Sequence, residues 1–182
     1  RKILAVAIEC FWTKRRWLRL IDVPNNIEGK TRWEKGEGDA YQGHAWINRE
    51  QVDPDDELWF TEGIFNTLSL EQVGIQSAST FSSSHVPTKF LEGLAKTQPI
   101  VVALDSDNAG QKGTVTLIEA LKVNGFTNIK AAQSPYGKDW NDLLVSGALK
   151  DNTKQETIEE ALWRGRLLLA DTFAEYRKVY EE

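Results

Sequence analysis

The pattern of hydrophobic and polar positions changes part-way along the chain. Within residues 1–50, apolar or alternating runs at 3–11 and 17–23 flank a basic turn at 13–16, which is typical of a β-hairpin. Residues 24–43 are rich in glycine and charged residues and are therefore expected to form a loop. The first part of the chain is thus predicted to be β-rich.

Short apolar runs alternate with helical patterns after the polar break at residues 53–56. Strands are expected over residues 57–61, 75–80, 100–104 and 128–132, and helices over 65–73, 87–96 and 109–123. Residues 100–104 are a continuous apolar run rich in β-branched residues, which is typical of a strand buried on both faces. Repeated strand–helix units of this length predict an α/β fold with a parallel sheet flanked by helices.

Three segments follow from these patterns. We expect a smaller β-rich subdomain over residues 1–55, an α/β domain over 56–150 and a C-terminal helical segment over 151–182. In residues 155–182 apolar positions recur at helical spacing, which predicts one long amphipathic helix. That helix either packs on its own domain or leads toward a following domain, and the sequence leaves both open.

Composition narrows the class of protein. The chain has 182 residues, of which 41% are hydrophobic, enough for a substantial core. It has no apolar run long enough to span a membrane and no hydrophobic signal segment at its start. Its single cysteine, Cys10, excludes an internal disulfide framework and suits a reducing, cytoplasmic setting. The chain contains no Met and begins at Arg1, so we expect it to be a segment of a longer protein.

Charge is divided unequally along the chain. The net charge of −5 argues against a simple electrostatic binder of nucleic acid. Residues 1–50 nevertheless hold 10 Lys+Arg against 7 Asp+Glu, and the remaining residues hold 12 against 20. This division suits a protein that handles phosphates, although ordinary solvated faces explain it equally well. The candidate nucleic-acid contacts in the basic part are Lys14, Arg15, Arg16 and Arg32.

Tryptophans accompany these cations. Four of the seven Trp residues lie in the first 50 residues, at Trp12, Trp17, Trp33 and Trp46. Aromatic rings can stack on bases while nearby cations hold phosphates. The commoner explanation is that such rings fill a small core.

Two aspartates directly follow the strand predicted over residues 100–104. Asp105 and Asp107 are two residues apart, so in an extended segment their side chains can point to the same face. Two unit charges 4 Å apart repel by about 4 kcal/mol at the dielectric of a protein surface. A divalent cation would remove this repulsion, and carboxylate ligands suit Mg²⁺. Alternatively, the aspartates only cap the next helix.

A third acid is expected at the same edge of the sheet. Glu62 follows the strand predicted over residues 57–61, and parallel strands place their carboxyl ends together. Gly63 beside it permits a close backbone approach or an unusual turn. We therefore expect Glu62, Asp105 and Asp107 to form one acidic cluster.

Candidate phosphate contacts surround this cluster. The helix predicted over residues 109–123 would present backbone N–H groups near Ala109 and Gly110, where the helix dipole favours an anion. Lys112 and Lys138 are candidate phosphate contacts, although surface lysines are commonly just solvated.

Three motifs carry a family resemblance. They are T-E-G-I-F-N-T-L-S-L at residues 61–70, L-D-S-D-N-A-G-Q-K-G at 104–113 and G-K-D-W-N-D-L-L at 137–144. In this order and spacing they resemble the Toprim domain, which bacterial-type DNA primases, topoisomerases, recombination proteins and some nucleases share. The second and third motifs look most like primases and primase-helicases of phages, plasmids and other mobile elements. The resemblance assigns the Toprim domain to residues 56–150.

The resemblance implies a role for each matched acid. Glu62 would act as a metal ligand or general acid–base group, Asp105 and Asp107 would hold Mg²⁺ or Mn²⁺, and Asp139 would add a further acid to the metal site. The implied activity is the synthesis of primers on single-stranded DNA from nucleoside triphosphates. A helicase domain or protein is the implied further partner, and no membrane is involved.

Two departures and two alternatives accompany this interpretation. Asn66 and Asn141 stand where related sequences can carry acids, which predicts a weaker second metal site. The same acids could serve a Toprim nuclease, in which water replaces the primer hydroxyl as the attacking group. A non-catalytic module that binds nucleic acid or recruits a helicase is the other alternative. A topoisomerase is disfavoured, because it would need a tyrosine nucleophile from a separate domain.

Overall fold

The computed structural model describes residues 4–21, 29–36, 40–134, 139–149 and 166–168. The chain divides into two compact units, Arg1–Gln42 and Gly43–Glu182, which are described separately. This division falls earlier than the boundary expected after residue 55. The reason is that strand β4, Trp46–Ile47, pairs with the sheet of the second unit.

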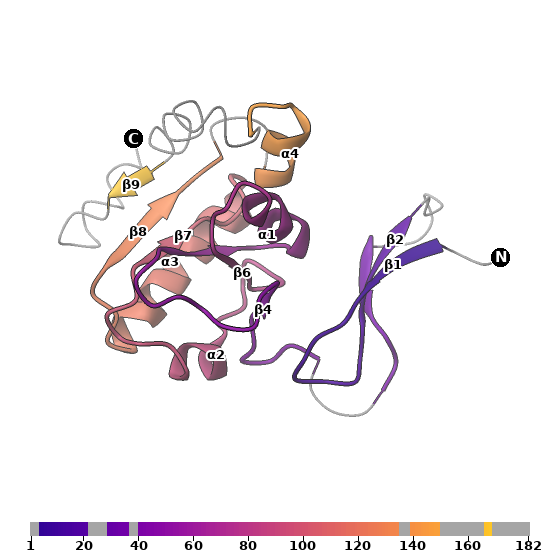
Figure 1. Ribbon diagram of the computed structural model, residues 1–182, viewed down its shortest axis with the longest axis horizontal. Coiled ribbons are helices and arrows are strands. Elements are labelled where there is room, and N and C mark those ends of the chain that lie inside the picture. Colours follow the sequence, from indigo (N-terminus) through magenta and orange to yellow (C-terminus); the bar gives the residue numbers. More distant parts are fainter. Residues whose placement is uncertain (1–3, 22–28, 37–39, 135–138, 150–165, 169–182) are drawn as a thin grey trace. The chain divides into compact units, whose positions relative to one another are not determined.

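The first unit is built on a three-stranded antiparallel sheet of order β1-β2-β3. Figure 1 labels two of its strands, β1 and β2. Strands β1, Leu4–Ile8, and β2, Trp17–Ile21, form the predicted hairpin. Strand β3, Thr31–Trp33, lies inside the segment predicted as a loop and pairs with β2. Trp17 is buried, which agrees with a role in the core. Cys10 is also buried, and burial raises the pKa of its thiol to about 12.

The second unit contains a six-stranded mixed sheet of order β4-β6-β5-β7-β8-β9. Its further strands are β5, Leu58–Thr61; β6, Ser77–Ser79; β7, Ile100–Val102; β8, Ile129–Ala132; and β9, Arg166–Leu168. The four central strands, β6, β5, β7 and β8, are parallel as predicted. The two outer strands, β4 and β9, run antiparallel to their neighbours, so the sheet is mixed and not wholly parallel.

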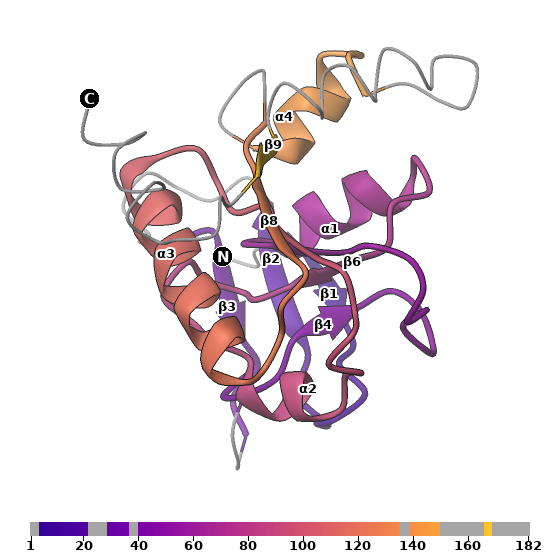
Figure 2. The same ribbon diagram turned by 90° about the vertical axis from the view of Figure 1, so that its left-hand side faces the viewer.

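Helices cover both faces of this sheet, as Figure 2 shows for α1 and α3. They are α1, Ile64–Glu71; α2, Thr88–Glu92; α3, Asn108–Val123; and α4, Trp140–Val145. Side chains of β5 alternate between two hydrophobic clusters, because successive residues of a strand face opposite sides. Phe60 joins the cluster that includes residues of α2 and α3, and Trp59 joins the cluster that includes residues of α1 and α4. The central strands are thus buried on both faces.

The C-terminal prediction needs a correction. Arg166–Leu168, within the segment predicted as one long helix, form strand β9 and pair antiparallel with β8. An uninterrupted helix over residues 155–182 is therefore wrong, and the rest of that segment lies outside the described residues. Among the described residues, no helix combines the length and the apolar character needed to cross a membrane.

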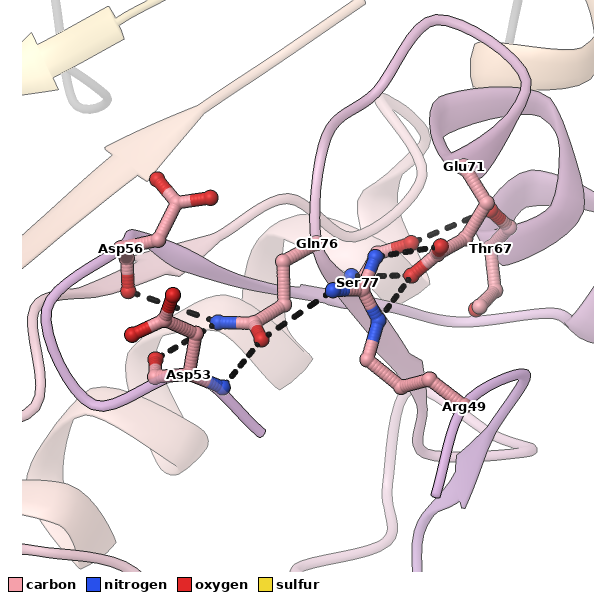
Figure 3. A network of polar contacts seen from close by, with 7 residues as sticks. All are labelled: Arg49, Asp53, Asp56, Thr67, Glu71, Gln76 and Ser77. Atoms are coloured by element: carbon pink, nitrogen blue, oxygen red, sulfur yellow. Dashed lines mark hydrogen bonds and ion pairs between the residues drawn. The ribbon is translucent and has the colours of Figure 1, made fainter. Parts of the chain in front are cut away.

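A polar network lies at the edge of the sheet where β5 and β6 begin (Figure 3). Arg49 forms an ion pair with Glu71, whose Oε1 also accepts from the backbone N of Ser77 at 2.9 Å. The side chain of Gln76 accepts from Asp53 N at 2.6 Å and donates to Asp53 O at 3.0 Å. We call Arg49, Asp53, Glu71, Gln76 and Ser77 the amino-edge network. It joins the segment before β5 to α1 and β6.

Candidate functional site

The opposite edge of the sheet, where β5 and β7 end, carries the acidic residues. Phe60 pairs with Val102, and Ala103 N donates to Phe60 O at 2.8 Å. Extending this register by two residues brings Glu62 level with the residue before Asp105. Glu62 therefore follows β5 and Asp105 follows the adjacent parallel strand β7, both at the carboxyl edge of the sheet, as predicted from the sequence.

The turn that carries Glu62 is fixed by hydroxyl groups. Thr61 Oγ1 lies 2.7 Å from Thr67 Oγ1 and donates to Gly63 O at 3.2 Å, and Ser79 Oγ donates to Glu62 O at 3.2 Å. The Oε2 atom of Glu62 is buried. Gly63 has φ −115° and ψ 150°, and a Cβ added there would meet no atom within 4 Å. The turn therefore does not need glycine, and Gly63 instead leaves open space beside Glu62.

Asp105 is only 8% exposed. Its Oδ1 accepts a hydrogen bond from Asn66 Nδ2 at 2.9 Å. The first turn of α3 packs directly on its backbone, because a Cβ added at Gly110 would lie 2.0 Å from Asp105 O. Sequence reasoning gave a special role to Gly63, but Gly110 is the glycine that this site requires.

Asp107 is the N-cap of α3. Its Oδ1 accepts from Ala109 N at 3.1 Å and from Gly110 N at 3.0 Å. The capping bond expected under that alternative is thus present at Asp107. Because these amides donate to Asp107, the prediction that they receive phosphate is not supported. A carboxylate has about four lone-pair sites, so capping and cation binding are chemically compatible.

Asp139 caps the neighbouring helix α4 in the same way, accepting from Asp142 N at 2.9 Å. The next residue, Trp140, is fully buried and donates from Nε1 to Ala103 O at 2.7 Å. This bond anchors the start of α4 to the end of β7. Sequence reasoning missed α4, although an Asp at the N-cap and an acid in the first turn are both signals of a helix start.

The acids form no ready-made metal site. Within the described residues, no group of three or more His, Cys, Asp or Glu side chains is placed to hold a metal ion. Asp105 Oδ1 instead accepts from Asn66, and Asp107 Oδ1 accepts from the start of α3, so a metal site shared by Glu62, Asp105 and Asp107 stays a prediction. Their hard carboxylate oxygens, together with the buried oxygen of Glu62, still match the ligands that Mg²⁺ prefers.

The predicted cationic contacts are found in different settings. Lys112 is exposed on α3, and Lys138 lies outside the described residues. In the first unit, Lys14 and Arg32 are exposed. The other two cations of this unit both contact Glu34. Arg16 forms an ion pair with Glu34 and lowers the pKa of the Glu34 carboxyl, and Arg15 Nε donates to the backbone O of Glu34 at 2.8 Å.

Comparison with known proteins defines the class of this chain. Residues 59–144 match the family model described as Toprim-like. The match covers all three motifs. The chain therefore carries a Toprim domain, as its motifs indicated.

Curated relatives narrow this class to the DNA primase type. A DNA primase of Synechocystis sp. is 28% identical over 115 residues, which cover 59% of this chain and 18% of the relative. A DNA primase of Mycoplasma pneumoniae is 31% identical over 106 residues, which cover 53% of this chain and 17% of the relative. The chain thus spans less than a fifth of the relatives it matches.

Solved structures share the fold. A DNA primase domain from Pseudomonas aeruginosa superposes with a TM-score of 0.72 at 17% identity, covering 99% of this chain and 56% of that one. A DnaG primase catalytic domain bound to single-stranded DNA superposes with a TM-score of 0.57 at 18% identity, covering 88% of this chain and 52% of that one. The α/β fold with its β-rich N-terminal part is therefore that of primase catalytic domains.

Proposed function

We propose that this chain supplies the Toprim catalytic region of a DNA primase, which joins nucleotides into primers on single-stranded DNA. The observation that carries the proposal is the position of Glu62 and Asp105, which follow adjacent parallel strands at one edge of a Toprim domain. The relatives that bear the name DNA primase support it. A cytoplasmic setting, nucleoside triphosphate substrates and a helicase partner belong to the same proposal, and origin in a mobile element stays a prediction.

The carboxylates at this edge would hold Mg²⁺ or Mn²⁺. Glu62, Asp105 and Asp107 are the proposed ligands, with Asp139 as a further acid at the start of α4. A cation bound there supplies charge neutralisation for triphosphate oxygens and lowers the pKa of an attacking hydroxyl. Hard oxygen ligands and a buried carboxylate oxygen make the site chemically suited to that role.

The candidate residues would also act on the substrates. Glu62 is proposed to act either as one of these ligands or as the general base that accepts the proton of the attacking primer hydroxyl. Lys112, exposed on α3, would contact the triphosphate, and Lys138 would join it. In the first unit, Lys14, Arg15, Arg16 and Arg32 would contact template phosphates, which predicts binding that weakens as salt rises.

A template-dependent synthesis assay tests this function. The chain is incubated with single-stranded DNA, labelled ribonucleotides and Mg²⁺, and an end-labelled strand in the same reaction reports cleavage. Labelled primers should form with wild type and fall by about 100-fold or more with Glu62→Gln or Asp105→Asn, as when a group that stabilises the transition state is lost. Loss of the end-labelled strand without primers would indicate the nuclease instead.

Two controls make this assay decisive. Asp55→Asn makes the same chemical change at an exposed position near the amino-edge network and should leave synthesis unchanged. If the chain alone makes no primers, binding of Mn²⁺ in the same preparation shows whether the metal site exists. Absence of both synthesis and Mn²⁺ binding would contradict the proposal.

A further inference from the structure

The side chain of Asn66 connects three segments at the carboxyl edge. Asn66 lies in the first turn of α1 and is 5% exposed. Its Nδ2 donates to Asp105 Oδ1 at 2.9 Å, and its Oδ1 accepts from the backbone N of Asn141 at 3.2 Å. One buried amide thus joins α1, the segment after β7 and the first turn of α4.

The chemistry of its partners requires an amide at this position. An ionised carboxylate only accepts hydrogen bonds and a peptide N–H only donates them, so the orientation of the Asn66 amide is determined. An aspartate here would keep the bond to Asn141 but would place a second carboxylate against Asp105. An alanine would lose both bonds.

The bond to Asn141 gives an acceptor to a backbone N–H group that has none within its own helix. Asn141 is the second residue of α4 after its N-cap, and N–H groups in the first turn of a helix have no intrahelical acceptor. Ser69, further along α1, reinforces this contact because its Oγ lies 3.3 Å from Asn141 Oδ1. The bond from Trp140 to Ala103 holds the same turn of α4 in place.

We propose that Asn66 is a positioning residue of the carboxyl edge. It fixes the direction of the Asp105 carboxylate and holds the first turn of α4 beside it, without adding a negative charge. A neutral donor at this position limits the charge of the edge, and therefore its affinity for divalent cations. The statement about cations rests on the proposed function, whereas the statement about the bridge does not.

Hydrogen exchange tests the bridge without any metal. In Asn66→Ala, the amide of Asn141 should exchange faster than in wild type, because its acceptor is gone. In Asn66→Asp, an oxygen remains to accept this bond, so protection should stay close to wild type. Circular dichroism establishes that both variants are folded. Equal protection of Asn141 in wild type and Asn66→Ala would overturn the bridge.

Binding of Mn²⁺, followed by electron paramagnetic resonance, tests the effect on Asp105. Asn66→Ala should weaken binding by about tenfold or more, as when a hydrogen-bond partner of a metal ligand is lost. Asn66→Asp should tighten it, because a carboxylate is added. Asn124→Asp makes the same change at the far end of α3, where Asn124 donates to Ala120 O, and should leave binding unchanged.

The two measurements separate two kinds of failure. If wild type binds no Mn²⁺, with or without nucleotide, the proposed function fails, and the exchange result still decides the bridge. If wild type binds Mn²⁺ and both Asn66 variants bind it equally well, the positioning role is wrong.

Discussion

The two edges of the central sheet both hold buried polar side chains, but they combine them differently. At the amino edge, the carboxylate of Glu71 meets the guanidinium of Arg49, and Gln76 satisfies both backbone groups of Asp53. At the carboxyl edge, the carboxylate of Asp105 meets a neutral amide, and an oxygen of Glu62 is also buried. The amino edge thus pairs opposite charges, whereas at the carboxyl edge a carboxylate is paired with a neutral amide beside two further acids, Glu62 and Asp107.

We therefore expect the residues of the amino edge to serve stability and the acids of the carboxyl edge to serve ligand binding. Burying a carboxylate is unfavourable unless donors or cations compensate, so we expect a bound cation to stabilise the carboxyl edge. Substitutions at the amino edge should therefore change stability alone. Substitutions of acids at the carboxyl edge should change ligand binding more than stability.

Gly110→Ala should have the largest effect, because this position links fold and site. The added Cβ would lie 2.0 Å from Asp105 O, so α3 or Asp105 must move. We expect a loss of about 1–3 kcal/mol, despite the better helix propensity of alanine, together with weaker Mn²⁺ binding. Urea unfolding measures the first effect. Gly93→Ala is the matched control: its Cβ would meet only Phe90 O, at 3.5 Å, and it should be nearly neutral.

Gln76→Ala tests the amino edge alone. Gln76 is fully buried, and its removal leaves Asp53 N and O without this partner, which should cost about 1–3 kcal/mol in unfolding free energy. Mn²⁺ binding by the folded protein should not change. A weakened metal site with unchanged stability would show that the two edges are not separate in the way proposed.

Paired substitutions of Asp107 separate its cap from its charge. Asparagine is as good an N-cap as aspartate, so Asp107→Asn should keep stability while lowering affinity for Mn²⁺. Asp107→Ala should lower affinity similarly and also cost about 1 kcal/mol, because the cap of α3 is lost. Equal Mn²⁺ affinity in wild type and Asp107→Asn would leave Asp107 with the capping role alone.

His85 predicts a smaller, pH-dependent effect. Its Nδ1 contacts Thr80 O at 2.7 Å and its Nε2 accepts from Gly43 N at 3.0 Å, as a neutral ring with Nδ1–H does. Burial lowers the pKa of His85 below the ordinary value of 6.5, and the charge of His44 adds to this. The unfolded chain then binds the proton more readily, so stability should fall as pH drops below about 6.5. Thermal melting of His85→Gln between pH 7.5 and 5.5 should lack this part of the decline.

Much of the fold could be predicted from sequence, because its central strands and α3 have clear periodic patterns. Strands β5, β7 and β8 and helix α3 lie where apolar runs and helical spacing placed them. Strands β3, β4 and β9 were missed, since all three are short edge strands that depend on pairing with one neighbour, whereas the equally short β7 lies within a continuous apolar run. The hairpin was predicted correctly because both of its strands are long enough to show an apolar or alternating pattern.

The candidate site was predicted in outline only. Parallel topology was enough to bring Glu62 and Asp105 to one edge. The roles of Asn66 and Gly110 could not be predicted, because they depend on contacts with Asp105 across the fold. The capping bond of Asp107, in contrast, is local, so it could be predicted from the sequence. The same residue was also predicted to be a metal ligand.

Thermal melting of wild type and Asp105→Asn with increasing Mg²⁺ or Mn²⁺ tests the central claim most directly. A ligand that binds only the folded state at a hundredfold excess over its Kd adds about 2.7 kcal/mol of stability. If the carboxyl edge binds a divalent cation through Asp105, the wild-type Tm should rise by several degrees while that of Asp105→Asn stays nearly constant. An unchanged wild-type Tm, with nucleoside triphosphate also present, would contradict it, as would an equal rise in both proteins.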